Sequence, residues 1–243
     1  MGFPLRSDAG FNAWSVHARR GKLSAMKPLC AHGCRIAQVA LAAVFVGLLT
    51  FDAVAGPDLM IATYRAKTTV EYRRKTFSTG DCAYQEACVR GTGVRKLLLL
   101  DVGVKNVGTS DLVIGDPNAR PDLFVWSGCH GHFHLKGLAT YRVLRPGGSQ
   151  IAKTYKQGFC LRDDSPKAPY AGPGKFTCDY QGISKGWQDT YDKSLDCQWV
   201  DITGVPPGKY NLEITVNPNH VLRETNYKNN KVVFTIYVPR NVY

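Results

Sequence analysis

The chain has 243 residues, of which 44% are hydrophobic and 21% are charged, and its formal net charge is +12 at pH 7. This composition is that of an ordinary globular protein, and the length is compatible with one or two domains. We find no internal repeat and no low-complexity linker, which argues against repeat architectures and against a long disordered segment.

The amino-terminal region differs in composition from the rest of the chain. Residues 1–35 carry six Lys and Arg side chains, and an apolar run follows at residues 36–51. Ala53-Val54-Ala55 then forms a small-x-small cleavage signature. Together these features predict a secretory signal peptide over residues 1–55, with Gly56 as the first residue of the exported chain.

A signal peptide that starts at Met1 would be too long, so we expect translation to begin at Met26. The alternative is an uncleaved membrane anchor. However, the apolar run is shorter than the roughly 20 residues that a spanning helix needs, and no later segment is apolar enough to span. We therefore expect a secreted protein, extracellular or periplasmic, with no membrane span after cleavage.

The exported chain remains basic. Removal of residues 1–55 takes away six basic and two acidic residues, which leaves 25 Lys and Arg against 17 Asp and Glu, a net charge of +8. The charges are scattered, without a long basic run or a nucleic-acid-binding motif. We interpret the excess as a general surface bias and expect no nucleic-acid partner.

Six cysteines follow the predicted leader, which contains the other two, Cys30 and Cys34. An even number in an oxidising compartment indicates three disulfides, but six cysteines allow 15 connectivities and the sequence cannot choose among them. Cys82 and Cys88 most simply close a small local loop. A thiolate metal site is disfavoured because there is no Cys-x-x-Cys pair.

The remaining pattern is mostly β. Short alternating or extended runs, separated by Gly, Pro and Asn, predict an all-β fold with an antiparallel β-sandwich core. Residues 145–200 are rich in turn formers and predict long irregular, disulfide-stapled loops that carry functional residues. We expect one domain over residues 56–243. The predicted strands span residues 95–106, 111–115, 138–144, 208–218 and 231–238.

The most informative stretch is Cys129-His130-Gly131-His132-Phe133-His134. Three of the four histidines after the leader lie here in alternation. Residues i, i+2 and i+4 of a strand point to one face, but an ideal strand would leave the outer pair roughly 13 Å apart. The segment must therefore curl, which Gly128 and Gly131 permit. We predict a metal site, because imidazole is the commonest metal ligand; the alternative is an exposed histidine stripe.

Three motifs in order give the chain a resemblance to a known family. Residues 129–134 resemble the copper-binding Cys-His-x-His-aromatic-His motif of the lysyl oxidases, with Trp126 just before it. Residues 156–163 are similar to the segment that holds the cofactor lysine of that family. Residues 189–203 are similar to the segment that holds its cofactor tyrosine. The resemblance covers roughly residues 59–238.

This resemblance implies a copper-dependent amine oxidase that contains lysine tyrosylquinone. The resemblance implies that His130, His132 and His134 bind the copper, and that the cofactor forms from Tyr191 and Lys156. The enzyme would convert primary amines, peptidyl lysine or small amines, to aldehydes, with consumption of O₂ and release of H₂O₂ and NH₃. Lysine-containing extracellular or envelope proteins are the expected partners, and we expect a monomer.

Proton abstraction from the substrate needs a general base. We select Asp189, two residues before Tyr191, because a carboxylate with a raised pKa suits this role. Asp192 and Asp196 compete with it. Taken alone, Lys156 and Tyr191 are typical of a surface lysine and a half-buried aromatic residue.

The chain departs from the family pattern at several positions. Ser127 and Gly128 precede Cys129, where animal members place another histidine, so we expect a contact around the metal to be lost. The resemblance further suggests that Cys129 pairs with Cys178. With the local Cys82–Cys88 loop, the remaining expected pair is Cys160–Cys197.

Two other functional classes stay open. One is a non-catalytic secreted β-sandwich that binds copper or zinc, with Lys156 and Tyr191 unmodified. The other is a metal hydrolase with an open coordination position at the histidines. No Glu adjoins the triplet in sequence to act as its base, although an acid from elsewhere in the chain would serve if the fold brings it there.

Overall fold

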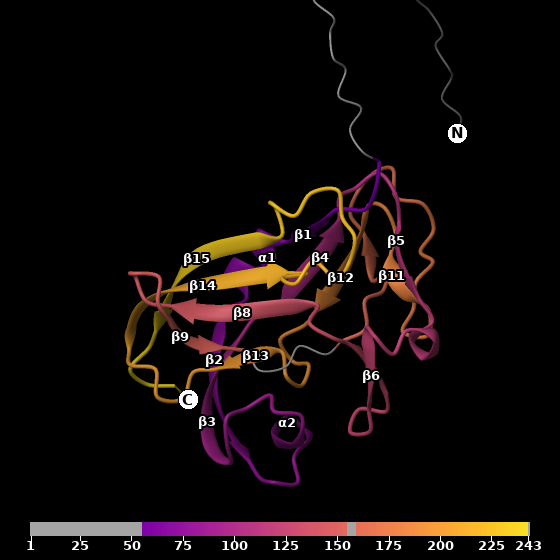
Figure 1. Ribbon diagram of the computed structural model, residues 1–243. Coiled ribbons are helices and arrows are strands. Elements are labelled where there is room, and N and C mark those ends of the chain that lie inside the picture. Colours follow the sequence, from indigo (N-terminus) through magenta and orange to yellow (C-terminus); the bar gives the residue numbers. More distant parts are fainter. Residues whose placement is uncertain (1–54, 155–158, 243) are drawn as a thin grey trace, which may run out of the picture. The chain divides into compact units, whose positions relative to one another are not determined.

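The computed structural model describes residues 55–154 and 159–242 (Figure 1). The predicted signal peptide and translation start lie outside these residues, apart from Ala55. No helix within the described part of the chain is both long and apolar enough to cross a membrane.

The fold is all-β, as predicted, and the strand ladders are antiparallel. The first sheet has four strands in the order β15-β14-β8-β9. Its members are β8 (Ala139–Leu144), β9 (Gln150–Lys153), β14 (Gly208–Val216) and β15 (Lys231–Val238).

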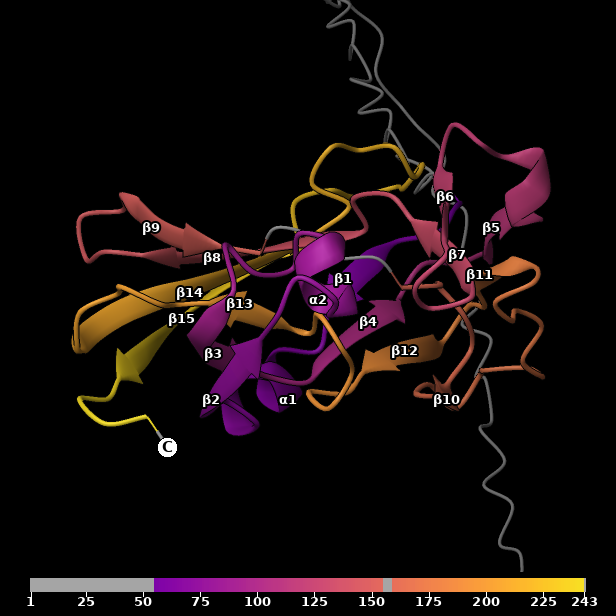
Figure 2. The same ribbon diagram turned by 90° about the horizontal axis from the view of Figure 1, so that it is seen from below.

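Two further sheets pack near this sheet, as Figure 2 shows, and β13 contacts both β8 and β9. The second sheet has the order β13-β3-β2, with β2 (Glu71–Phe77), β3 (Gly93–Leu99) and β13 (Trp199–Asp201). The third has the order β1-β4-β12-β10, with β1 (Leu59–Ile61), β4 (Val102–Asn106), β10 (Ser165–Pro166) and β12 (Trp187–Tyr191).

Two small two-stranded sheets and three short helical segments complete the described elements. The sheets are β5 (Leu112–Gly115) with β11 (Gln181–Ile183), and β6 (Phe124–Ser127) with β7 (His132–Leu135). The helical segments are α1 (Thr63–Thr68), α2 (Cys82–Gln85) and the 3₁₀ turn η1 (Pro117–Ala119).

Side-chain alternation explains how these strands form a shared core. On β14, Leu212 and Ile214 are fully buried, and Ile214 lies opposite the buried Tyr141 of β8. Residues two apart on a strand share a face, so the apolar face of β14 contacts the other sheets while polar side chains alternate with it. The strands predicted near residues 138–144, 208–218 and 231–238 are therefore confirmed.

Two strand predictions need correction. The run 95–106 is not one extended segment but two strands, β3 and β4, in different sheets. The chain changes direction at Asp101, which is buried and accepts a hydrogen bond from the backbone N–H of Lys193 at 2.9 Å. Residues 145–200 also contain short strands, β9 to β12, and β13 begins there. Such short strands carry little periodicity of their own and are specified by distant partners, as β12 is by β4.

All three expected disulfide pairings are wrong. The bonds join Cys82 to Cys129, Cys88 to Cys197, and Cys160 to Cys178. The local Cys82–Cys88 loop does not form because α2 and the turn after it direct the two side chains to different partners. Sequence spacing gave no information about these directions, which depend on the tertiary fold.

A buried ion pair links two strands of the second sheet. The Oδ2 of Asp201 accepts hydrogen bonds from Arg95 Nη2 at 2.8 Å, Arg95 Nε at 3.0 Å and the backbone N–H of Arg90 at 3.0 Å. Burial raises the pKa of the Asp201 carboxyl, but these bonds and those from Thr203 outweigh it, so that the pKa lies below its ordinary value.

We expect Asp201→Asn to lower the free energy of unfolding by about 3 kcal/mol at pH 7, because Arg95 loses its buried partner. The difference in unfolding free energy between the variant and the unsubstituted protein should shrink as the pH falls below about 4. At that pH Asp201 becomes protonated, and the stabilisation from its ionised carboxylate is lost. Urea unfolding at several pH values measures both effects. Asp122→Asn, which removes the exposed partner of Arg120, is the control and should change little; equal losses in both variants would contradict the assignment.

Candidate functional site

A short hairpin positions the three histidines. In the pairing of β6 with β7, Ser127 lies opposite His132. His130 lies in the connecting turn, where the backbone N–H of Gly131 donates to the carbonyl of Ser127 at 2.8 Å. Gly131 has φ +68°, in the left-handed region that favours glycine. The segment therefore curls, as expected from the spacing, and His130 leaves the line of the strand.

The curl brings the three imidazole rings together. Their centroids are separated by 5.9 Å for His130 and His132, 5.2 Å for His130 and His134, and 4.9 Å for His132 and His134. Ligand nitrogens of His130 and His134 lie within 4.8 Å of one another, but His132 does not belong to that group, so the structure brings two of the three predicted ligands together. In addition, His130 Nε2 is buried without a hydrogen-bond partner among the described residues. A metal ion would supply that partner.

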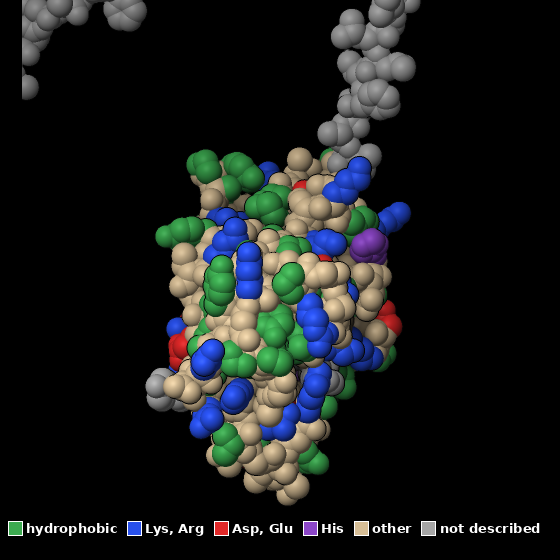
Figure 3. Space-filling model, turned by 90° about the vertical axis from the view of Figure 1, so that its left-hand side faces the viewer, with side chains coloured by type: hydrophobic (Ala, Val, Ile, Leu, Met, Phe, Trp, Pro, Cys, Tyr) green, Lys and Arg blue, Asp and Glu red, His purple; other side chains and the backbone are tan. Residues whose placement is uncertain are grey.

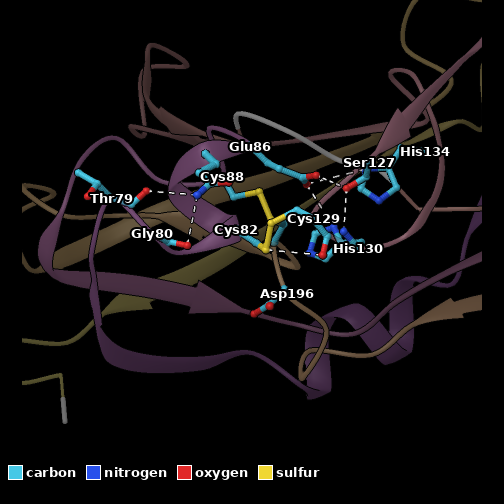
Figure 4. Close-up of a disulfide and its surroundings, with 12 residues drawn as sticks. Thr79, Gly80, Cys82, Glu86, Cys88, Ser127, Cys129, His130, His134 and Asp196 are labelled. Atoms are coloured by element: carbon cyan, nitrogen blue, oxygen red, sulfur yellow. Dashed lines mark hydrogen bonds and ion pairs between the residues drawn. A yellow bond between two sulfur atoms is a disulfide. The ribbon is translucent and has the colours of Figure 1, made fainter.

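The structure adds an acidic residue that the sequence prediction missed. Glu86 follows α2, and its Oε2 lies 3.3 Å from His130 Nδ1 and 3.9 Å from His134 Nδ1. One ligand atom from each of these three residues lies within 4.8 Å of the others. Figure 4 shows Glu86 beside the Cys82–Cys129 disulfide, with its carboxylate near Ser127 and His130. The only sequence signal was its position between two cysteines.

A cavity of about 380 Å³ reaches His132. Trp126, Phe133 and Asp179 contribute to its lining, and the rings of Trp126 and Phe133 meet edge to face at 5.1 Å. Trp126 is 56% exposed, so it does not serve the packing role that Trp199 has in the core. An aromatic face and a carboxylate together suit a cationic group.

A second cluster surrounds Tyr191 on β12. Its hydroxyl donates to Asp189 Oδ2 at 3.0 Å and also lies 3.2 Å from the carbonyl oxygen of Cys160. The two side chains share a face because they are two residues apart on a strand. Burial raises the pKa of Asp189 to about 7, although the backbone N–H of Arg162 and the Tyr191 hydroxyl lower it. Burial and Asp189 raise the pKa of Tyr191 well above its ordinary value.

Phe159 connects the two clusters. Its ring stacks on Tyr191 with centroids 5.1 Å apart, and its carbonyl accepts from the backbone N–H of Leu135, next to His134, at 3.3 Å. Lys156, the expected cofactor lysine, lies outside the described residues and three positions before Phe159. The histidine segment and the tyrosine segment thus meet at Phe159, within the lysine segment of residues 156–163.

The two competing acids lie in different surroundings from Asp189. Asp192 and Asp196 are both exposed, and Asp196 forms an ion pair with Lys75 at 3.3 Å. Hydrogen bonds from Ser194 hold the pKa of Asp192 below its ordinary value. His220 is also exposed and stacks on Tyr227, with centroids 4.1 Å apart. Asp189 is the buried acid of the three, and its raised pKa is that of a base near neutral pH.

The surface agrees with a general basic bias. On the face in Figure 3, Lys and Arg side chains are spread among hydrophobic and uncharged ones rather than gathered in one stripe. Fold and site together define a disulfide-bonded all-β protein with converging imidazoles close to a buried tyrosine–aspartate pair.

Comparison with known proteins gives the family. The model of the lysyl oxidase family matches residues 57–242, so the chain belongs to the lysyl oxidase family. It is 34% identical over 187 residues to protein-lysine 6-oxidase of Sus scrofa, which covers 72% of this chain and 74% of that protein. The same identity holds for protein-lysine 6-oxidase of Homo sapiens, of which 44% is covered. Lysyl oxidase homolog 4 of Homo sapiens is 32% identical, with 72% of this chain and 24% of that protein covered.

The raised pKa of Asp189 predicts a pH-dependent contribution to stability. The pKa of this carboxyl rises from about 4 in the unfolded chain to about 7 in the folded protein. Its contribution to the stability of the folded protein is therefore complete below about pH 4, where the carboxyl is protonated in both states. Between these values the unfolding free energy should fall by up to about 1.4 kcal/mol per pH unit. Asp189→Asn removes this term, so its difference from the unsubstituted protein should change across pH 4–7.

Urea unfolding of the metal-free protein from pH 4.5 to 7.5 measures that difference. Asp179→Asn, at an exposed carboxyl, is the control and should keep the unsubstituted pH profile. A constant difference between the Asp189→Asn and unsubstituted proteins would contradict the assigned pKa.

Proposed function

We propose that this chain is a copper-dependent amine oxidase of the protein-lysine 6-oxidase type. Its reaction would convert a primary amine, O₂ and water to an aldehyde, NH₃ and H₂O₂. The observation that carries the proposal is the meeting of the three family motifs at Phe159, which contacts both Tyr191 and the strand of His134. Family membership and the names of the relatives support the same reaction class.

We assign the metal to His130, His132 and His134. The family motif assigns all three histidines, and the closeness of the His130 and His134 ligand atoms and the buried Nε2 of His130 support two of them. Imidazole nitrogen suits copper, and bound copper would supply the one-electron chemistry with O₂ that oxidation of a tyrosine needs. The hairpin turn fixes the ligands relative to one another before any ion binds, which lowers the cost of ordering them.

We further propose that Tyr191 and Lys156 are the precursors of lysine tyrosylquinone, which would supply an electrophilic carbonyl to the substrate amine. Tyr191 must lose its phenolic proton to be oxidised. Asp189 Oδ2 is positioned to take it, because it accepts the hydrogen bond from Tyr191 and has a pKa of about 7. Phe159 covers one face of the ring and helps to exclude water.

We also assign to Asp189 the removal of the α-carbon proton of the substrate. Its burial keeps a fraction of the carboxyl ionised and a fraction protonated near neutral pH, which suits a group that both accepts and returns a proton. The exposed Asp192, with its lowered pKa, is a weaker base at the same pH.

For substrates we propose peptidyl lysine on exported proteins, with small primary amines as the other class. The cavity beside His132 supports a cationic substrate, because Trp126 and Phe133 offer aromatic faces and Asp179 offers a carboxylate. Disulfides form in oxidising compartments, so the three bonds support export of the chain after removal of residues 1–55.

Glu86 provides an argument for a second candidate, a metal hydrolase. The acid that such an enzyme needs does not adjoin the histidines in sequence, but the fold places Glu86 beside His130. A non-catalytic copper- or zinc-binding module is the remaining alternative. Both alternatives leave Tyr191 and Lys156 chemically unmodified, which separates them from the oxidase.

If the chain is this oxidase, aerobic copper loading should join the Lys156 and Tyr191 peptides and produce a quinone absorption band. Mass spectrometry of the digested protein detects the crosslink. Peroxide should then be released when a primary amine is added, and Tyr191→Phe should abolish both signals, because a phenylalanine ring lacks the phenol.

Tyr210→Phe is a matched control, because Tyr210 is also buried but its hydroxyl bonds only to Pro206 among the described residues. It should keep the crosslink and the peroxide release. A copper-loaded protein with no crosslink and no peroxide would reject the oxidase and favour the binding module. Retention of both signals in Tyr191→Phe would reject the assignment of Tyr191.

A further inference from the structure

The carboxylate of Glu86 contacts the ring of His130 directly and its backbone through Ser127. Its Oε2 lies 3.3 Å from His130 Nδ1. Its Oε1 accepts a short hydrogen bond from Ser127 Oγ, and the same hydroxyl oxygen accepts the backbone N–H of His130 at 3.1 Å. Glu86 and Ser127 therefore hold both the ring and the backbone of His130.

The covalent structure keeps Glu86 in this place. Glu86 lies between Cys82, which bonds to Cys129, and Cys88, which bonds to Cys197. The first bond attaches the α2 loop to the residue next to His130, and the second attaches it to the segment before β13. Figure 4 shows the carboxylate directed from this loop toward Ser127 and His130. The position of the acid is thus fixed on both sides along the chain.

The two nitrogens of His130 have different surroundings. Nδ1 faces Glu86, whereas Nε2 is buried without a hydrogen-bond partner among the described residues. A metal-bound histidine commonly donates its other N–H to a carboxylate, which fixes the tautomer and the ring orientation. At His130 the carboxylate of Glu86 lies 3.3 Å from Nδ1, which leaves Nε2 for an ion.

We propose that Glu86 is a positioning residue of the metal site, which acts through His130 with Ser127 as its support. The inference rests on the proposed assignment of the histidines as metal ligands. Glu86 holds His130 in the tautomer that presents Nε2 and increases the electron donation of that nitrogen to the metal. Its negative charge also lies 3.9 Å from His134 Nδ1 and favours a cation bound at both rings.

The proposal gives Ser127 a role. Ser127 is buried, with 2% of its surface exposed, and it is one of the two residues before Cys129 that depart from the family pattern. The contact around the metal that we expected to be lost is replaced, on this view, by the hydroxyl that connects Glu86 to the His130 backbone. A small side chain at this position leaves room for the carboxylate to approach the imidazole.

Copper(II) affinity of the full exported chain tests the inference by competition with a chelator. Glu86→Gln keeps the size of the side chain and removes its charge, and we expect the affinity to fall about 10- to 100-fold. Ser127→Ala keeps the carboxylate but removes its support, and we expect a smaller loss in the same direction. Glu71→Gln, which removes a carboxylate from the exposed ion pairs of β2, is the control and should bind as the unsubstituted protein does.

A spectroscopic measurement separates positioning from general stability. Pulsed electron paramagnetic resonance of bound copper(II) reports the quadrupole coupling of the imidazole nitrogen that does not bind the metal. This coupling depends on the hydrogen bond at that nitrogen, so it should change in Glu86→Gln and stay unchanged in Glu71→Gln. If Glu86→Gln does not fold, as judged by near-ultraviolet circular dichroism, Ser127→Ala carries the same two measurements.

Three outcomes would decide against the inference or its basis. Unchanged affinity and unchanged coupling in Glu86→Gln, together with weak binding in His130→Gln, would reject the role of Glu86 alone. Loss of an oxygen ligand from copper in Glu86→Gln, measured by X-ray absorption, would make Glu86 a direct ligand and reject positioning. Unchanged affinity in His130→Gln would instead reject the metal site itself.

Discussion

The Cys82–Cys129 disulfide is the constraint on which the rest of the site depends. It joins a loop and a hairpin turn that are 47 residues apart, with their Cα atoms 5.7 Å from one another. A covalent bond between such distant segments removes much of their freedom in the unfolded chain. It also sets the distance between the acid that follows α2 and the first histidine of the triplet. The Cys88–Cys197 bond holds the other end of the same loop, so Glu86 cannot move away from His130 without distortion on both sides.

The tyrosine cluster depends on a simpler device, the two-residue period of a strand. On β12, Asp189 and Tyr191 fall on one face, and both are buried, with Tyr191 packed in the hydrophobic core. Burial favours the neutral form of an acid, which explains the raised pKa of Asp189. The hydrogen-bonded pair of Asp189 and Tyr191 thus results from their spacing on one strand and from their burial.

Phe159 contacts both the histidine cluster and the tyrosine cluster, the first through its backbone and the second through its ring. Its ring packs on the tyrosine, and its carbonyl extends the hydrogen bonding of β7 beyond the hairpin. The proposed metal ligands and the proposed cofactor tyrosine therefore share a boundary residue. A cavity lined by two aromatic rings and one carboxylate reaches His132.

The sequence determined the fold class, the family resemblance, the three histidines and the tyrosine–aspartate pair, because these features depend on local spacing. Alternation specified the long strands, and a glycine next to His130 permitted the curl that a straight strand would not allow. Only the tertiary structure decided the disulfide pairs, the short strands between residues 145 and 200, and the place of Glu86. Each of these depends on which distant segments meet, and a side-chain direction set by packing leaves no periodic trace in the sequence. The place of Glu86 beside His130 was therefore visible only after the chain had folded.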